Sequence, residues 1–203
     1  MMSSCVNDIK LAKKVLRKEI RLKVAAISPD DKVKQSRIVT EKVTESRDFQ
    51  NAKSLSLYLH MDDEIITEDI LKTALKRGKK CYIPRYFMGG NCMEMVELYD
   101  MQDYETLPLT KWNIKQPGDD EKRPEALEQG SLDLMLIPGM AFSLKGQRLG
   151  RGKGYYDTYL SKAESLGIRP KTLALAFNEQ IMPEIPCDSH DFTIDSIIYP
   201  NEK

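Results

Sequence analysis

The chain has 203 residues, of which 41% are hydrophobic, so it is long enough to fold as one domain with a substantial core. Its 31 basic residues equal its 31 acidic residues, which argues against a partnership with nucleic acid or a membrane surface. Its apolar runs are shorter than the roughly 20 residues that cross a bilayer, and its four cysteines form no CxxC pair. We therefore expect a cytoplasmic monomer whose single domain spans residues 1–203, with reduced thiols.

The first part of the chain is predicted to be helical. Residues 8–27 carry apolar side chains at helical spacing, at Ile9, Ala12, Leu16, Ile20 and Val24. The SPDD sequence at 28–31 supplies a serine cap, a first-turn proline and two acids for a second helix that runs to about Glu45. Thr67 is expected to cap a further helix that ends at Gly78, where a left-handed residue is favoured.

Short apolar segments further along the chain predict strands, at 54–59, 81–86, 93–98, 132–138, 172–177 and 194–199. The segment LDLMLIP at 132–138 is almost continuously apolar, which is typical of a strand covered on both faces. Residues 100–130 contain acids and prolines and predict a long surface connection, and residues 155–166 predict a helix that ends at Gly167. We expect an α/β fold, a Rossmann-like three-layer arrangement of a mainly parallel sheet flanked by helices, with an N-terminal helical segment.

The most informative segment is RLGRGKGYYD at 148–157, between a predicted buried strand and a predicted helix. Three glycines at alternate positions let backbone amides approach an anion closely, and three cations, Arg148, Arg151 and Lys153, lie in the same loop. The start of the following helix also favours negative charge. These features predict a polyphosphate-binding loop. It is not a Walker A loop, because Gly154 stands where Ser or Thr should hold magnesium, and the G-x-G-x-x-G spacing is absent.

This loop, together with PGMAFSLKGQRLG before it, closely resembles the signature of the 5-formyltetrahydrofolate cyclo-ligase family, particularly its animal members. Further segments match the family in the same order: KKVLRKEI (13–20), LYLHMDDEIIT (57–67), IPRY (83–86), LPLTKWNIKQP (107–117), LALAFNEQ (173–180) and HDFTID (190–195). The resemblance implies that ATP and 5-formyltetrahydrofolate are the substrates. The formyl oxygen would attack the γ-phosphate, and closure of the phosphorylated imidate by the folate 10-nitrogen would give 5,10-methenyltetrahydrofolate, ADP and phosphate.

The resemblance also assigns roles to residues. ATP would be bound by Lys13, Arg17, Arg148, Gly150, Arg151, Gly152, Lys153, Gly154, Tyr155 and Tyr156. Of these, Arg151, Lys153 and Tyr155 would act in catalysis. The folate would be bound by Leu59, Met61, Glu64, Tyr86, Trp112 and Tyr155. Magnesium would be held by Asp157 and Asp191, although Asp188 and Asp195 lie close enough in sequence to take the second position.

Several residue assignments have a plainer alternative. Lys13 and Arg17 share a helical face and could be a solvated basic surface. Even if they belong to the ATP site, their loss is expected to change stability very little. Trp112 could pack in a small satellite core. The family commonly has Asp at position 143, where this chain has Ser143, so we leave that position out of the site. Two other functions remain open from the loop alone: binding of single-stranded nucleic acid, and another α/β enzyme such as a sugar-phosphate isomerase or kinase.

Overall fold

The computed structural model describes residues 2–87, 90, 92–111, 113–188 and 191–201. The helices are α1 (Met2–Ala25), α2 (Pro29–Glu45), α3 (Arg47–Asn51), α4 (Glu68–Lys76), α5 (Met101–Thr106) and α6 (Tyr155–Ser165), with a 3-10 turn, η1 (Asn178–Gln180). The strands are β1 (Ser54–Ser56), β2 (Lys80–Tyr86), β3 (Met93–Leu98), β4 (Leu134–Ile137), β5 (Ala141–Phe142), β6 (Arg148–Leu149), β7 (Lys171–Leu175) and β8 (Ser196–Ile198).

One sheet organises the molecule. Its strand order is β3-β2-β1-β4-β7-β8, and all neighbouring strands are parallel except β2 and β3. The chain therefore builds outward from β1 to β3 and then returns to the other side of β1 to continue with β4. In open sheets of this kind, ligands bind at the carboxyl ends of the strands beside such a reversal of strand order.

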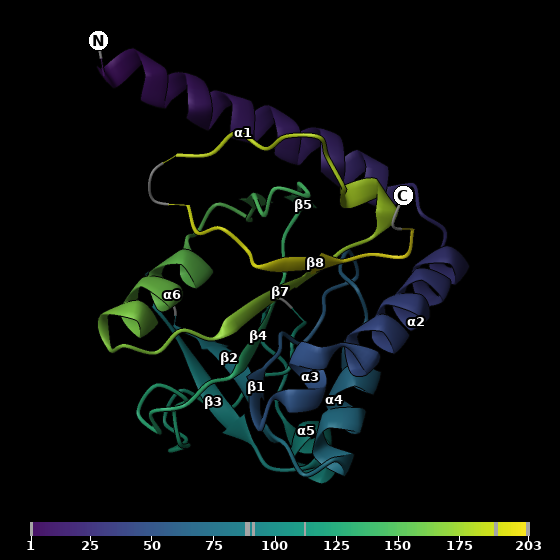
Figure 1. The fold of residues 1–203 in the computed structure, drawn as a ribbon, viewed down its shortest axis with the longest axis vertical. Helices are drawn as coiled ribbons and strands as arrows, with labels where there is room; N and C mark the ends of the chain where they lie inside the picture. The colour runs from purple at the N-terminus through teal and green to yellow at the C-terminus, as the bar shows by residue number, and fades with distance from the viewer. Residues whose placement is uncertain (1, 88–89, 91, 112, 189–190, 202–203) are drawn as a thin grey trace.

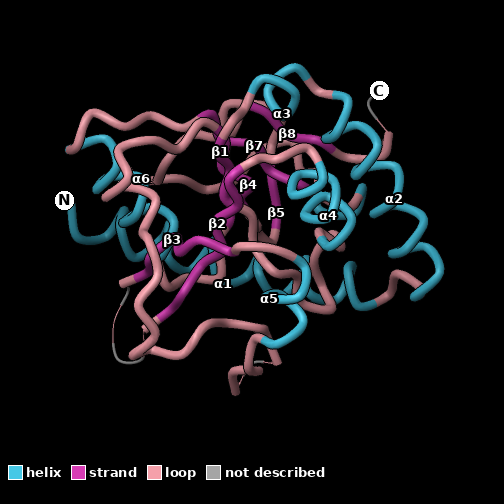
Figure 2. Tube along the Cα trace, turned by 90° about the horizontal axis from the view of Figure 1, so that it is seen from below, coloured by secondary structure: helices cyan, strands magenta, loops and turns pink. Residues whose placement is uncertain are grey.

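Helices cover both faces of the sheet, as the sequence predicts. On β4, Leu134 and Leu136 belong to one buried cluster and Met135 and Ile137 to another, because successive side chains of a strand point to opposite faces. The first cluster includes residues of α2 and α4, and the second includes residues of α6. Figures 1 and 2 show α4 and α6 on opposite sides of the strands. The expected three-layer α/β fold is confirmed.

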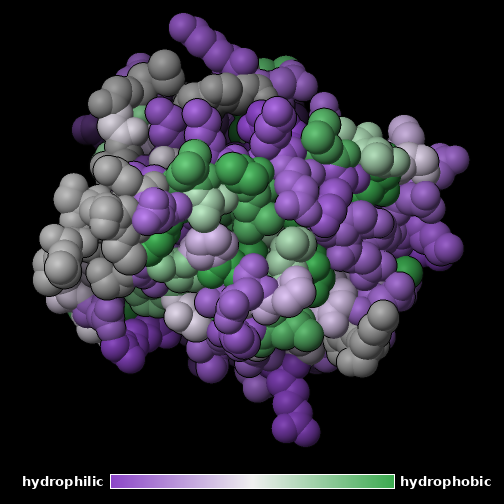
Figure 3. Space-filling view, turned by 90° about the horizontal axis from the view of Figure 1, so that it is seen from above, coloured by the Kyte–Doolittle hydropathy of each residue, from purple (hydrophilic) through white to green (hydrophobic). Residues whose placement is uncertain are grey.

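Helix α1 lies along the outside of this body (Figure 1). Ile20 and Val24 on its inner face are buried, whereas Ala12, which the sequence analysis placed on the same face, is exposed. The outer face carries exposed apolar side chains at Leu11, Val15 and Leu22. Figure 3 views the molecule from this side and shows apolar side chains gathered near its centre. No helix of the described residues has both the length and the apolar character needed to cross a bilayer.

Several local expectations were wrong in whole or in part. Thr67 is the N-cap residue of α4, as predicted, but its side chain makes no capping hydrogen bond, because its hydroxyl donates instead to the carbonyl oxygen of Tyr58 at 2.7 Å. The predicted surface connection at 100–130 contains α5 and buried apolar residues, namely Leu107, Ala126 and Leu127. The loop after β4 contains the short β5–β6 hairpin. The serine cap of α2 and the left-handed glycines that end α4 and α6 are confirmed.

Candidate active site

A cavity of about 470 Å³ opens at the carboxyl ends of β1 and β4. Tyr58, Leu59 and Met61 line it from the chain after β1, and Pro138 and Gly139 line it from the chain after β4. It thus occupies the place where the strand order reverses. The structure brings together all the predicted site residues that it describes: Lys13, Arg17, Leu59, Met61, Glu64, Tyr86, Arg148, Gly150, Arg151, Gly152, Lys153, Gly154, Tyr155, Tyr156, Asp157 and Asp191. The other predicted site residue, Trp112, lies outside the described residues.

The glycine-rich loop forms one wall of the cavity, between β6 and α6. Gly152 and Gly154 have φ angles of +95° and +72°, which residues with a Cβ atom rarely adopt. Gly154 is the residue immediately before α6, so the first turn of the helix borders the cavity. Backbone amides at the start of a helix attract anions, because they have no partner within the helix. The loop is therefore suited to bind phosphate groups.

Helix α1 contributes two cations to the cavity lining, beside the glycine-rich loop. The Nε atom of Arg17 donates to the carbonyl oxygen of Gly150 at 2.9 Å. The Nζ atom of Lys13 lies 2.9 Å from Asp188 and 2.5 Å from Asp191. Burial opposes the charge on Lys13, but the hydrogen bonds to Asp191 and Asp188 outweigh it and raise the pKa. The Lys13 side chain is 11% exposed, so the alternative of a solvated basic face is wrong for this residue.

Two carboxylates on the cavity wall could hold a magnesium ion. One oxygen of Asp157 pairs with Arg148 at 2.8 Å, and the other accepts a hydrogen bond from the backbone of Phe192 at 3.3 Å. This second bond brings the residue next to Asp191 against α6. Two carboxylates suit magnesium that is bound largely through phosphates and water, although no group of three or more potential metal ligands occurs among the described residues.

The three aspartates considered for the second metal position lie in different places in the structure. Asp195 accepts hydrogen bonds from the backbone and the hydroxyl of Thr172, each at 2.8 Å, at the start of β7 and away from the cavity. Asp188 is bonded to Lys13 but does not line the cavity, whereas Asp191 does. Ser143 also lies outside the cavity: its buried hydroxyl donates to Oε1 of Gln147 at 2.7 Å in the β5–β6 turn.

Arg151 connects the glycine-rich loop to the segment after β1. Its guanidinium group lies 2.6 Å from Asp63 and 3.0 Å from Glu64. The other Glu64 oxygen accepts a hydrogen bond from the backbone of Met61 at 3.0 Å. Burial raises the pKa of Glu64, and Arg151 partly offsets this effect. The sequence analysis missed Asp63, although its place beside Glu64 in the MDDEIIT segment was a usable signal.

Aromatic side chains form the remaining wall. The rings of Tyr86 and Tyr155 meet edge to face with centroids 4.9 Å apart, and the hydroxyls of Tyr86 and Tyr156 are 3.5 Å apart. Burial raises the pKa of Tyr156 far above its ordinary value, so this hydroxyl stays neutral. Ile114 and Leu149 extend the apolar surface and were not predicted, because neither residue carries a chemical signal in the sequence. Such a wall suits a planar ring system.

The fold and the cavity define a doubly wound α/β protein in which a glycine-rich loop with three cations and a set of aromatic and apolar side chains line one cavity, at the point where the strand order reverses. The sequence model of the 5-formyltetrahydrofolate cyclo-ligase family matches residues 9–200, and the chain belongs to this family.

Curated relatives and solved structures agree with this membership. The chain is 47% identical to the 5-formyltetrahydrofolate cyclo-ligase of Mus musculus, over 93% of each chain. It is 39% identical to a probable 5-formyltetrahydrofolate cyclo-ligase of Caenorhabditis elegans, over 97% of each. Its structure is similar to that of the 5,10-methenyltetrahydrofolate synthetase of Aquifex aeolicus, with a TM-score of 0.74 and 25% identity over 91% of this chain and 88% of the other.

Proposed function

We propose that this protein catalyses the ATP-dependent cyclisation of 5-formyltetrahydrofolate to 5,10-methenyltetrahydrofolate, with ADP and phosphate as the other products. The observation that carries the proposal is one cavity lined both by a glycine-rich loop with three cations and by aromatic and apolar side chains with a buried carboxylate. One substrate must present a polyphosphate and the other a flat, partly polar ring. The names of the relatives that are 47% and 39% identical support the same reaction.

The phosphate half of the cavity would bind ATP and stabilise transfer of its terminal phosphoryl group. The formyl oxygen of the folate attacks the γ-phosphorus, and the bond to ADP breaks. Arg148, Arg151 and Lys153 spread positive charge around the oxygens of the transferring group, and the amide of Tyr155 adds a donor at the start of α6. Asp157 and Asp191 would hold a magnesium ion, which supplies further neutralisation of the phosphate charge.

The folate half would hold the pterin ring and keep water away. Glu64 is 7% exposed and can accept hydrogen bonds from the pterin NH groups, while Leu59, Met61 and the ring of Tyr86 pack against the ring faces. The folate 10-nitrogen then attacks the carbon of the phosphorylated imidate, loses its proton, and phosphate leaves. Exclusion of water matters at this step, because water would compete with the nitrogen for the same carbon.

We also propose that the protein acts as a single-domain monomer in the cytoplasm. The thiols of Cys81, Cys92 and Cys187 are free, as is usual in a reducing compartment. Sedimentation velocity of the purified protein tests the monomer directly.

The assay for the proposed reaction uses purified protein, ATP, magnesium and 5-formyltetrahydrofolate, and follows the absorbance of the methenyl product and the release of ADP. We expect one ADP per product molecule and no product when ATP is omitted. Lys153→Gln should lower kcat by on the order of a hundredfold, because it removes charge from the transferring phosphoryl group. The exposed Lys162 of α6, the helix that follows this loop, provides the control variant Lys162→Gln. Product formation without ATP, or its absence with ATP, refutes the proposal.

A further inference from the structure

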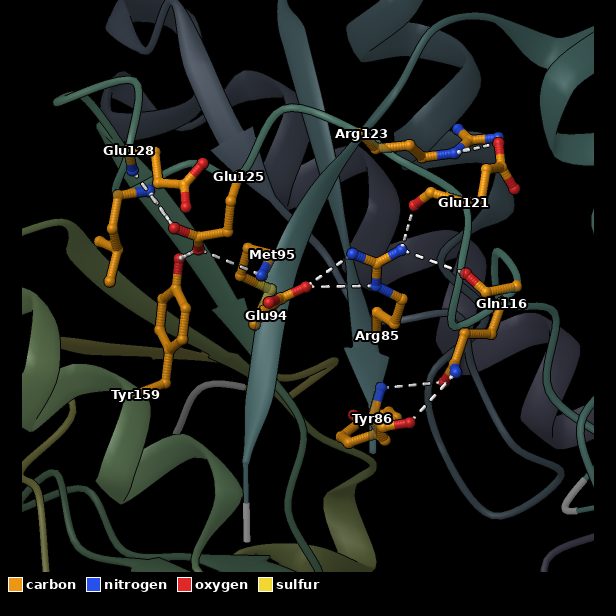
Figure 4. Close-up of polar contacts among 12 residues, drawn as sticks. Arg85, Tyr86, Glu94, Met95, Gln116, Glu121, Arg123, Glu125, Glu128 and Tyr159 are labelled. Carbon is orange, nitrogen blue, oxygen red and sulfur yellow. Dashed lines mark hydrogen bonds and ion pairs between the residues drawn. The ribbon is translucent and has the colours of Figure 1, made fainter. Parts of the chain in front are cut away.

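The side chain of Gln116 joins two parts of the cavity wall. Its Oε1 atom accepts a hydrogen bond from the backbone nitrogen of Tyr86 at 2.9 Å, and its Nε2 atom donates to the carbonyl oxygen of the same residue at 3.2 Å. Tyr86 lines the cavity, and so does Ile114, two residues before Gln116. Figure 4 shows both hydrogen bonds, at the end of β2. Gln116 itself is 7% exposed and does not line the cavity.

The geometry of β2 explains why one side chain can make both bonds. The ladder between β1 and β2 runs from Lys80 to Tyr82, four residues before Tyr86. On the other edge, the backbone nitrogen of Phe87 donates toward β3, to the carbonyl of Cys92. In an antiparallel ladder the backbone groups of successive residues point to alternate edges, so those of Tyr86 point away from β3. The amide of Gln116 takes the place that a neighbouring strand would occupy there.

The segment that carries Gln116 is fixed to the sheet at further points. Arg85 donates to the carbonyl oxygens of Gly118 at 3.1 Å and Glu121 at 2.6 Å, and it pairs with Glu94 on β3 at 2.7 Å (Figure 4). Lys115 donates to two carbonyl oxygens of α5, each at 2.8 Å. These bonds hold the segment as a whole, whereas Gln116 is the point at which it meets a cavity-lining tyrosine.

We propose that Gln116 is a positioning residue for folate: its double hydrogen bond to Tyr86 sets the separation between the Tyr86 ring and Ile114, and so the width of the slot for the pterin. This inference rests on the proposed function. Tyr86 also contacts Tyr155 and Tyr156 at the start of α6. The phosphate-binding loop, however, is held separately by Arg17. Loss of the Gln116 bonds therefore acts on folate binding much more than on ATP binding.

The test is steady-state kinetics with ATP and 5-formyltetrahydrofolate varied separately. Gln116→Met keeps the size of the side chain and removes both hydrogen bonds. We expect the KM for 5-formyltetrahydrofolate to rise about tenfold, while the KM for ATP changes less than twofold. The matched control is Gln35→Met, because Gln35 is 9% exposed and makes two similar hydrogen bonds to η1, away from the cavity. It should lower stability to a similar degree and leave both KM values unchanged.

A second variant separates positioning from general stability. In Gln116→Glu the ionised side chain can still accept the hydrogen bond from the Tyr86 nitrogen. It cannot donate to the Tyr86 carbonyl oxygen, because a carboxylate oxygen replaces the Nε2 group there. When protonated it can make both bonds again, so its folate KM should fall toward the wild-type value between pH 8 and pH 6, whereas Gln116→Met should not respond in this way. Equal changes in both KM values, or an unchanged folate KM in both variants, overturn the inference. Wild-type protein without cyclo-ligase activity would instead refute the proposed function.

Discussion

Glu64 combines a nearly buried carboxylate with a place in the proposed folate site. Burial raises its folded-state pKa above the ordinary value of 4.5, despite the opposing effect of Arg151. The folded protein therefore resists ionisation of this group. The resulting loss of stability is absent well below pH 4.5, grows as the pH rises toward the folded-state pKa, and is complete above it.

Glu64→Gln should consequently raise the free energy of unfolding at pH 7, and this gain should disappear near pH 4. Arg151 keeps Asp63 as a partner in the variant. The folate KM should rise on the order of tenfold, because an acceptor for the pterin is lost. Urea unfolding between pH 4 and pH 7, with the exposed Glu41→Gln as control, measures the first effect. A variant that is less stable than the wild type at pH 7 would contradict this account of the buried charge.

Lys13 differs from the exposed lysines around it. Because its side chain is buried against two carboxylates, Lys13→Ala should lower the free energy of unfolding by about 1–2 kcal/mol, well beyond what a surface lysine contributes. The KM for ATP should rise at least tenfold, since the variant leaves Asp188 and Asp191 uncompensated beside the phosphates. Denaturant unfolding and ATP-dependent kinetics measure the two effects, with the neighbouring exposed Lys14→Ala as control. Equal changes in unfolding free energy and in the KM for ATP in the two variants would show that Lys13 acts only as a solvated surface residue.

Among the elements, α5 is attached to the connection that follows it by a buried ion pair as well as by the hydrogen bonds from Lys115. Arg123 binds both oxygens of Asp103, at 2.6 and 2.7 Å, and the two side chains are 4% and 14% exposed. The hydrogen bonds from Arg123 lower the pKa of Asp103 in the folded protein, and burial opposes them. Stability from this pair is therefore present above the ordinary pKa of 3.8 and is lost as the pH falls through the folded-state value.

Asp103→Asn should lower the free energy of unfolding by about 2 kcal/mol at pH 7. The difference from the wild type should stay constant down to about pH 5 and shrink below pH 4. Thermal or urea unfolding across this range measures it, with Asp69→Asn as an exposed acidic control on α4. A difference that persists unchanged at pH 3 would show that the ionised pair is not its source.

The sequence predicted the elements better than their ends. Helical spacing and the SPDD cap located α1 and α2, because these signals are local. Three residues of the predicted strand at 54–59 form β1, and the last two, Tyr58 and Leu59, line the cavity instead. Thr67 stands at the predicted N-cap position, but its hydroxyl bonds to the carbonyl of Tyr58, a partner nine residues away that cannot be inferred from spacing. Contacts of this kind depend on the tertiary fold.

At the scale of the whole molecule, the glycines and cations of the loop predicted its place in the candidate site, whereas the residues that it contacts there could not be predicted. Pattern alone left a nucleic-acid-binding module and other α/β enzymes open, and the resemblance of ordered segments was needed to choose among them. The pairing of Arg151 with Asp63 and the bonds from Gln116 to Tyr86 join residues 88 and 30 positions apart. Neither pair produces a periodic pattern, so only the assembled fold reveals them.

The pairing of cations with carboxylates around the cavity has a kinetic consequence. Five cations line it, Lys13, Arg17, Arg148, Arg151 and Lys153, and five carboxylates lie on the wall or bonded to these cations in the described part of the chain, Asp63, Glu64, Asp157, Asp188 and Asp191. The ligand-free site is thus nearly neutral, as is the chain. Although ATP is highly charged, no long-range electrostatic field would attract it to the site. Its affinity would come from contacts in which its phosphates replace the carboxylates as partners of the cations.

We therefore expect the association rate of ATP, measured by stopped flow, to change less than twofold between 20 and 300 mM salt. Asp63→Asn leaves one positive charge unbalanced and should make the rate fall with added salt. A steep salt dependence of the wild-type association rate would contradict the proposal that phosphates replace carboxylates in a nearly neutral site. Because the site has almost no net charge, ATP would associate with it no faster than other small anions of the cell do. The protein would then distinguish ATP from these anions by a slower dissociation rate.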